Sequence, residues 1–378
     1  MKLFSCICQN LLFFESVRCT RCGRDLAYLP DREVVAPVTP LPDAPSVYRA
    51  AGDLHGTTRY RLCRNQTEHA VCNWAIALPG GQGAEDADAA AEYCLSCRLN
   101  RMIPNLSDPQ AKEAWHRLEI AKRRLLYTLY DLGLPVESKV DDPERGLAFS
   151  FLKDDPAAGK VFTGHSDGHV TINVAEADDP FREKMRVQMG EAYRTLLGHF
   201  RHEIGHYYFD RLIKDSPLLP DFRALFGDES ADYAAAQKRH YEQGPPADWG
   251  TRFVSAYASM HPWEDWAETW AHYLHMTDTL ETARAYGLAL KPRVADGPSQ
   301  PTLAVRRLDL HSIDDLVGGW FPLTMALNSL NRSMGLPDSY PFVLSEAAIE
   351  KLRFVHHVIE SEHERRDRDA ATPAAKAG

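Results

Sequence analysis

The sequence has no cysteine after Cys97, although eight cysteines stand between Cys6 and that position. This asymmetry predicts a boundary between a cysteine-rich first region and a cysteine-free remainder. A length of 378 residues favours two domains, or one large domain with an appendage. With 44% hydrophobic and 25% charged residues, the chain has the composition of a globular protein and can build a full core.

The sequence also lacks a long apolar run and an excess of basic residues. No stretch reaches the about 18 apolar residues of a membrane span. The apolar stretch 11–14 is too short for a signal peptide, whose apolar region needs about 7–15 residues. The 43 Lys and Arg against 53 Asp and Glu give a net charge of −10, which argues against a nucleic-acid partner. We therefore expect a soluble, cytoplasmic protein with no membrane partner.

Residues 36–45 contain four prolines and are typical of an extended, semi-rigid linker. This linker is expected to divide the cysteine-rich region into two pieces. Beyond residue 107 the apolar residues follow a helical period, starting with Pro109 at a first helical position and ending at Gly133. Further helices are expected at 179–213, 263–280, 314–334 and 345–364, and short strands at 147–152 and 169–174. The charged tail after Arg365 is typical of disorder.

The cysteines form two sets of four. The first set is Cys6, Cys8, Cys19 and Cys22, and the second is Cys63, Cys72, Cys94 and Cys97. Thiolates one or two residues apart let a tight turn point two sulfurs at one tetrahedral ion, and four thiolates leave no open position. We therefore expect two structural zinc ions.

Two alternatives to these zinc sites stay open. A disulfide framework needs an oxidising compartment, which the missing export signal argues against. In the second set the gap between Cys63 and Cys72 is long, so His69 remains a possible replacement for either cysteine. The segment 19–24 resembles a zinc-ribbon knuckle, for which a scaffold role is the expectation.

An H-E-x-x-H motif stands at residues 202–206. On a helix, His202 and His206 lie on one face and can bind one zinc ion, while Glu203 sits beside the open coordination position. Zinc lowers the pKa of bound water towards about 7, and a neighbouring glutamate can take its proton and pass it to a leaving amine. The motif therefore predicts a catalytic zinc with Glu203 as general base. Two solvated histidines on a polar helix face are the bland alternative.

A third zinc ligand is expected from the helix that begins near Trp263. Glu264 and Glu268 stand one turn apart among tryptophans, where unpaired buried charge is expensive. We assign Glu264 to the metal and Glu268 to a hydrogen bond with a ligand imidazole. Asp210, four residues after His206, is a second candidate to orient a ligand histidine.

Three competing readings accompany these assignments. Glu229, within the long segment between His206 and Glu264, is an alternative third ligand. His199 is expected to pack or cap rather than to ligate. Asp210 fits a solvated carboxylate at a helix end about as well as a partner of a histidine.

Three stretches identify the chain as similar to a family of bacterial zinc-binding metallopeptidases with an N-terminal zinc ribbon. They are residues 173–179, residues 193–206 around the motif, and residues 261–273 around Glu264. The ribbon at Cys6–Cys22 belongs to the same resemblance, which covers most of the chain.

The Glu-x-x-x-Glu helix is also similar to the third-ligand helix of gluzincins of the anthrax lethal factor type. In that group a tyrosine seven residues before the first glutamate stabilises the oxyanion, and the matching residue here is Tyr257. The resemblance therefore implies a catalytic role for Tyr257. Packing as an ordinary aromatic is the alternative.

Together these observations predict an α+β protein with a mainly helical, zincin-like metallopeptidase domain and a small edge β-sheet, preceded by a cysteine-rich region. The expected segments are a zinc ribbon at 1–35, a second zinc-binding segment at 46–105, the peptidase domain at 106–365 and a disordered tail at 366–378. A peptide or protein is the expected substrate, and a binding module on a non-catalytic scaffold is the alternative. Hydrolysis of a non-peptide amide also stays open. The sequence leaves the oligomeric state undetermined.

Overall fold

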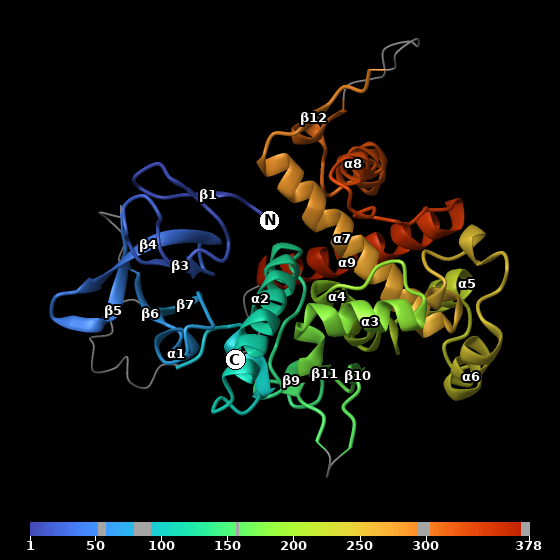
Figure 1. Ribbon diagram of the computed structural model, residues 1–378, viewed down its shortest axis with the longest axis horizontal. Coiled ribbons are helices and arrows are strands. Elements are labelled where there is room, and N and C mark those ends of the chain that lie inside the picture. Colours follow the sequence, from blue (N-terminus) through green and yellow to red (C-terminus); the bar gives the residue numbers. More distant parts are fainter. Residues whose placement is uncertain (52–57, 79–91, 156–158, 294–302, 372–378) are drawn as a thin grey trace. The chain divides into compact units, whose positions relative to one another are not determined.

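The computed structural model describes residues 1–51, 58–78, 92–155, 159–293 and 303–371 (Figure 1). Its contacts divide the chain into two compact units. The first consists of Met1–Arg124, Ala148–Val161 and Ile172–Ala177, and the second of Leu125–Leu147, Phe162–Thr171 and Asp178–Gly378. The mixture of helix and sheet and the cysteine-rich N-terminal region agree with the expected α+β class.

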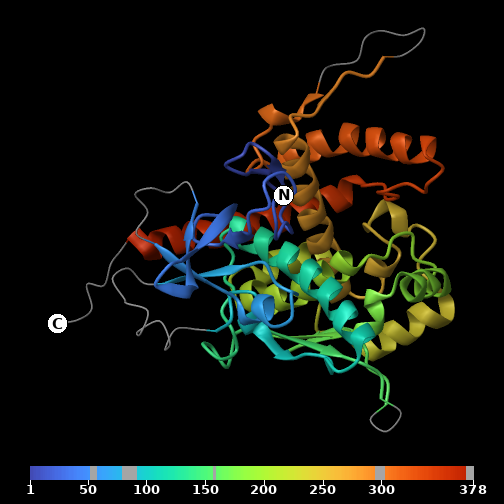
Figure 2. The same cartoon turned by 60° about the vertical axis from the view of Figure 1, so that its left-hand side comes forward.

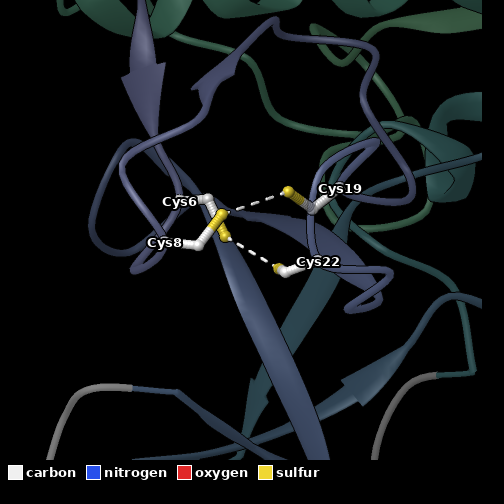
Figure 3. Close-up of side chains that lie close together, drawn as sticks. All are labelled: Cys6, Cys8, Cys19 and Cys22. Atoms are coloured by element: carbon white, nitrogen blue, oxygen red, sulfur yellow. Dashed lines mark hydrogen bonds between the residues drawn. The ribbon is translucent and has the colours of Figure 1, made fainter.

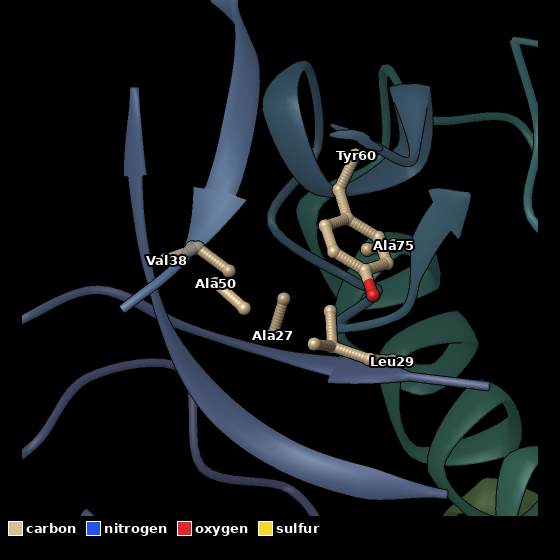
Figure 4. Close-up of a cluster of buried hydrophobic side chains, with 6 residues drawn as sticks. All are labelled: Ala27, Leu29, Val38, Ala50, Tyr60 and Ala75. Carbon is tan, nitrogen blue, oxygen red and sulfur yellow. The ribbon is translucent and has the colours of Figure 1, made fainter. Parts of the chain in front are cut away.

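The first unit is built on a five-stranded antiparallel sheet in the order β3-β4-β5-β6-β7. Its strands are β3 (Leu26–Leu29), β4 (Val34–Leu41), β5 (Ala44–Ala50), β6 (Arg59–Leu62) and β7 (Ala75–Leu78). Alternate apolar side chains of these strands meet on one face. Figure 4 shows this cluster, which consists of Ala27, Leu29, Val38, Ala50, Tyr60 and Ala75.

The expected linker at 36–45 is wrong, because most of these residues belong to the hairpin of β4 and β5. Pro37 lies opposite Leu26, Pro40 lies opposite Tyr48, and the register shifts after Pro40. β-Branched residues favour the strand, and a bulge accommodates a residue without an N–H group. The cysteine-rich region is therefore continuous through one sheet and is not divided at this point.

Short elements complete the first unit. They are β1 (Phe4–Ser5), β2 (Leu11–Leu12), α1 (Arg64–Thr67), η2 (Cys97–Leu99), β8 (Asn100–Met102), β9 (Ala148–Leu152) and η3 (Val174–Ala177). β1 pairs with β2 antiparallel, and β8 pairs with β9 parallel. Helix α2 (Pro109–Asp131) and strand β11 (His169–Asn173) each contribute residues to both units.

The second unit is mainly helical. Besides parts of α2 and β11, it contains β10 (Gly164–Ser166), α3 (Asp179–Met189), α4 (Leu196–Tyr208), η4 (Phe209–Ile213), α5 (Leu219–Phe226), α6 (Tyr233–Gln243), η5 (Trp249–Thr251), η6 (Tyr257–Ser259), α7 (Pro262–Ala285), β12 (Ala289–Leu290), β13 (Leu303–Ala304), η7 (Val305–Arg307), α8 (Ile313–Ser333) and α9 (Glu346–Ala371). β10 and β11 form an antiparallel hairpin with His165 opposite Val170.

The single helix expected at 179–213 is wrong. Helix α3 ends at Gly190, which adopts φ 67° in the left-handed region that favours glycine. A new helix, α4, begins after Thr195, whose side chain accepts a hydrogen bond from the Gly198 N–H. After Tyr208 the helix widens into the π-helical turn η4.

Helix α7 is the centre of the second unit, and Figures 1 and 2 show it passing α8 and α9. Its buried aromatic residues include Trp266, Trp270 and Tyr273. Helix α4 packs directly on α7, since a Cβ on Gly205 would lie 2.9 Å from Ala267 Cα. This close approach positions the two helices that carry the H-E-x-x-H motif and the candidate third ligand.

Helix α9 continues to Ala371, six residues into the segment expected to be disordered, and residues 372–378 lie outside the described residues. Within the described part of the chain, no helix is both long enough and apolar enough to cross a membrane.

Candidate metal centre

The two histidines of the motif lie on one face of α4. The rings of His202 and His206 are 4.9 Å apart, and their Nε2 atoms are separated by 3.2 Å. His206 is buried, and its ring also lies 3.8 Å from the Trp263 ring. The contact with Trp263 therefore restricts the orientation of the His206 imidazole.

Helix α7 brings Glu264 to the same point. Its Oε2 lies 3.0 Å from His202 Nε2 and 3.5 Å from His206 Nε2. The three candidate ligand atoms therefore converge on one place, as three ligands of a single ion do. Burial opposes ionisation of Glu264, but the two histidines outweigh it and hold the pKa of this carboxyl well below its usual range.

Glu268 fixes the orientation of His202. Its Oε1 lies 2.8 Å from His202 Nδ1, and its Oε2 accepts a 2.6 Å hydrogen bond from the Ser255 hydroxyl. A carboxylate at Nδ1 holds a proton on that nitrogen and turns Nε2 towards Glu264. Burial alone would lower the pKa of His202, but the contacts with Glu264 and Glu268 raise it well above its ordinary value.

Glu203 lies between the two histidines in the sequence and is 8% exposed. Burial raises the pKa of its carboxyl, and the nearby charges of His202 and His206 oppose that rise. A carboxyl with a raised pKa takes up and releases a proton more readily near neutral pH, as a general base must.

Of the two further residues expected near the metal, Tyr257 lies close to His202, and Asp210 does not bond to a ligand histidine. The Tyr257 ring lies 6.0 Å from the His202 ring, and burial together with the Glu264 charge raises the pKa of its phenol. Asp210 lies 3.7 Å from Lys214 Nζ, while the buried Nδ1 of His206 has no hydrogen-bond partner among the described residues. The expected bond from Asp210 to a ligand histidine is therefore wrong, because the change to π geometry at Phe209 interrupts the α-helical i, i+4 stacking.

The competing third ligand Glu229 and the nearby His199 both lie outside the group of three converging residues. Glu229 forms an ion pair with Arg223 at 2.6 Å. His199 is partly buried, and desolvation lowers its pKa well below the ordinary value. Neither residue shares the point at which His202, His206 and Glu264 meet.

Sequence reasoning missed two neighbours of the site. Tyr233, at the start of α6, donates a 2.8 Å hydrogen bond to Glu264 Oε1. His165, on β10, stacks beside His206 with 6.4 Å between the ring centroids. Neither residue belongs to a local sequence pattern. They could have been found only by expecting that the segment between α4 and α7, and the hairpin of β10 and β11, fold back against the motif helix.

The residues fit a zinc ion. Glu264 Oε2 is buried and accepts no well-aligned hydrogen bond among the described residues, although His202 Nε2 and His206 Nε2 lie 3.0 and 3.5 Å away. This oxygen can therefore bind a cation together with the two imidazoles. Two imidazole nitrogens and one carboxylate oxygen are a donor set found in zinc enzymes with an open fourth position.

The first cysteine set also converges. Figure 3 shows Cys6 and Cys8 facing Cys19 and Cys22, with Sγ separations of 3.6 Å for Cys6–Cys22 and for Cys8–Cys19. All four thiols are free. A backbone hydrogen bond from Arg24 is the main cause that lowers the pKa of Cys22 to about 6, which favours the thiolate that binds zinc.

The second set consists of four buried cysteines whose sulfur atoms also come together. Cys72 and Cys94 have their Sγ atoms 3.6 Å apart. His69 is not part of this group and lies 3.7 Å from Glu68. The buried Arg123 lies near these cysteines. Burial lowers the pKa of its guanidinium, but the charges of Cys72 and Glu119 outweigh this effect and raise it. A buried cation suits the two negative charges of a four-thiolate zinc site.

Comparison with known proteins agrees with this architecture. The sequence model of the family described as "Putative zinc-binding metallo-peptidase" matches residues 111–358, which include all three groups of the candidate metal centre. The chain belongs to this family. A zinc-ribbon domain model matches residues 3–108, so the resemblance seen in the sequence is confirmed.

Proteins similar to this chain occur in mycobacteria. Uncharacterized proteins of Mycobacterium tuberculosis and Mycobacterium bovis are 41% identical over 362 residues, which cover 95% of this chain and 96% of theirs. No solved structure matches the chain. This member of the zinc-binding metallo-peptidase family has three groups of side chains that suit zinc. Two consist of four cysteines each, and the third is His202, His206 and Glu264 on α4 and α7.

Proposed function

We propose that the chain is a zinc-dependent peptidase of the gluzincin type with a zincin-like fold. His202, His206 and Glu264 hold the catalytic metal, and Glu203 is the general base. The convergence of His202 Nε2, His206 Nε2 and Glu264 Oε2 beside a buried Glu203 is the observation that carries this proposal. The eight cysteines hold two structural zinc ions in the ribbon region.

Each side chain then has a separate task. Zinc, when bound, supplies a Lewis acid that polarises the scissile carbonyl and lowers the pKa of water. The Glu203 carboxylate accepts the proton of the attacking water and delivers it to the leaving amine nitrogen. Glu268 keeps the proton of His202 on Nδ1, so that Nε2 faces the metal.

Tyr257 is the proposed donor to the oxygen that becomes negative in the transition state. Burial and the Glu264 charge keep its phenol protonated, as a donor requires. The substrate is a peptide or protein, which the antiparallel hairpin of β10 and β11 suits, because an extended chain adds to a strand edge through main-chain hydrogen bonds.

The test compares the wild type with Glu203→Gln on an unbiased peptide and protein library at matched zinc content. We expect the variant to lose activity by about 10²–10⁴-fold, the usual contribution of a general base. Glu242→Gln, an exposed change on α6, is the matched control and should leave activity unchanged.

Equal cleavage by the wild type and Glu203→Gln would contradict the proposal. No cleavage by either protein, with zinc still bound at the histidines, would instead favour a binding module on a non-catalytic scaffold.

A further inference from the structure

Tyr233, in the segment between α4 and α7, hydrogen-bonds to Glu264, the proposed third ligand. Tyr233 Oη donates to Glu264 Oε1 at 2.8 Å. The other oxygen of the same carboxylate, Oε2, is the one that lies 3.0 Å from His202 Nε2 and 3.5 Å from His206 Nε2. The two oxygens of Glu264 therefore have different neighbours: Oε1 accepts from a neutral hydroxyl, and Oε2 faces the two histidines.

A histidine at the start of α7 connects this segment to Glu264. The Nδ1 atom of His261 accepts a 3.1 Å hydrogen bond from the Trp263 N–H and so caps α7. Its Nε2 therefore carries the hydrogen and donates to the Ala231 carbonyl oxygen at 3.0 Å. Ala231 is two residues before Tyr233, and Trp263 is adjacent to Glu264. His261 thus fixes the distance between the hydroxyl donor and the carboxylate acceptor.

The first residue of helix α6 contacts the residues around Glu264. Ala236 is the one buried residue among the described side chains of the helix. The Tyr233 ring, by contrast, contacts His261 at 5.3 Å and Trp263 at 5.9 Å between ring centroids. Asp232 caps the helix by accepting a hydrogen bond from Ala235 N–H. Ring contacts and a helix cap therefore position Tyr233, the residue that reaches Glu264.

We propose that Tyr233 is a positioning residue of the metal site, which holds Oε1 of Glu264 so that Oε2 alone faces the two histidines. This inference rests on the proposed function, in which Glu264 is the third ligand. A carboxylate without such a donor rotates freely or offers both oxygens, and ordering it then costs binding free energy. Partners that hold a ligand in this way usually contribute about 10–100-fold to metal affinity.

The test is zinc retention by the full chain against rising chelator concentration, with bound zinc counted after equilibration. Tyr233→Phe removes only the hydroxyl, and Tyr241→Phe is the matched control, because its ring lies on the same helix and is 58% exposed. We expect the wild type to hold three zinc ions and Glu264→Ala to hold two. Tyr233→Phe should release one ion at about 10–100-fold lower chelator concentration, while Tyr241→Phe matches the wild type.

A second comparison assigns the effect to the hydrogen bond. In a Glu264→Ala background, Tyr233→Phe should cause no further change in zinc retention. Wild-type retention by Tyr233→Phe would overturn the inference, and so would a loss spread over all three ions, which would report general destabilisation. Failure of the proposed function looks different: the wild type itself would hold only two ions, and Glu264→Ala would release none.

Discussion

The indole of Trp266 donates a 2.8 Å hydrogen bond to the main-chain carbonyl of Gly205. Gly205 lies inside the H-E-x-x-H motif, and Trp266 lies two residues after Glu264. This bond therefore connects the helix with two candidate ligands to the helix with the third. Both residues are buried, and their hydrogen bond fixes the distance between α4 and α7 at the H-E-x-x-H motif.

Gly205→Ala should destabilise the protein. Its new methyl group would lie 2.9 Å from Ala267 Cα, and overpacking of this kind costs about 1–3 kcal/mol. Gly318→Ala is the control, because it lies inside α8 with open space around its Cβ position and should stabilise by up to about 1 kcal/mol. Urea unfolding of both variants measures the difference. A neutral or stabilising Gly205→Ala would contradict the close approach of α4 and α7.

Glu268→Gln should weaken zinc binding without removing a ligand. The amide replaces the charge that holds the proton of His202 on Nδ1, so we expect about 10–100-fold lower affinity for one of the zinc ions. Competition with a chelator measures the affinity. Ser255→Ala, which removes the 2.6 Å hydrogen bond to the other oxygen of Glu268, should give a smaller loss in the same direction. Unchanged affinity in both variants would show that this carboxylate does not support the site.

Tyr257→Phe should lower kcat while zinc stays bound. If the phenol donates to the oxyanion, its loss costs about 10²–10³-fold, as for other single donors of this kind. Tyr286→Phe, an exposed change at the end of α7, is the control. Steady-state kinetics with zinc determined in parallel separates the two effects. Wild-type turnover in Tyr257→Phe would leave this tyrosine a packing role.

His272 should make stability depend on pH below neutrality. Burial lowers its pKa from 6.5 to about 4, against the opposing charge of Glu268. The unfolded chain therefore binds a proton between these values that the folded chain does not bind, and stability falls as pH falls. Between pH 7.5 and 5 the loss from this residue is about 2 kcal/mol.

The check is urea unfolding of the wild type and His272→Gln at both pH values. Subtracting one protein from the other removes the effect of zinc release, which both share. We expect the variant to gain about 2 kcal/mol relative to the wild type at the lower pH. An equal pH dependence of the two proteins would contradict a lowered pKa in His272.

Much of the helical framework could be predicted from the sequence, because α2 and α8 are long and have apolar periodicity with clear ends. The i, i+4 spacing predicted that His202 and His206 share a face, and their Nε2 atoms lie 3.2 Å apart. The tryptophans around Glu264 indicated a buried carboxylate that needs a positive partner, and Glu264 is 2% exposed beside both histidines.

The errors arose where local signals compete. A glycine such as Gly190 can adopt the left-handed conformation that ends a helix, but it can also lie inside one. The sequence therefore did not show that the helix breaks between α3 and α4. The prolines of residues 36–45 fit both a linker and a strand that accommodates them at a bulge. Tyr233 was missed because its contact with Glu264 spans 31 positions of the sequence, and no local pattern encodes such a distance.

The position of Glu264 in the sequence also determines when it is synthesised relative to the cysteines and the two histidines. A chain leaves the ribosome from its N-terminus, and domains formed early fold early. All eight cysteines emerge well before α7, so both sulfur clusters can be complete while the third group of the metal centre is still being synthesised. A nascent chain that stops before α7 has His202, Glu203 and His206 but lacks Glu264, the proposed third ligand. If the proposed function holds, the metal site on α4 and α7 can be completed only after the cysteine-rich region has been synthesised.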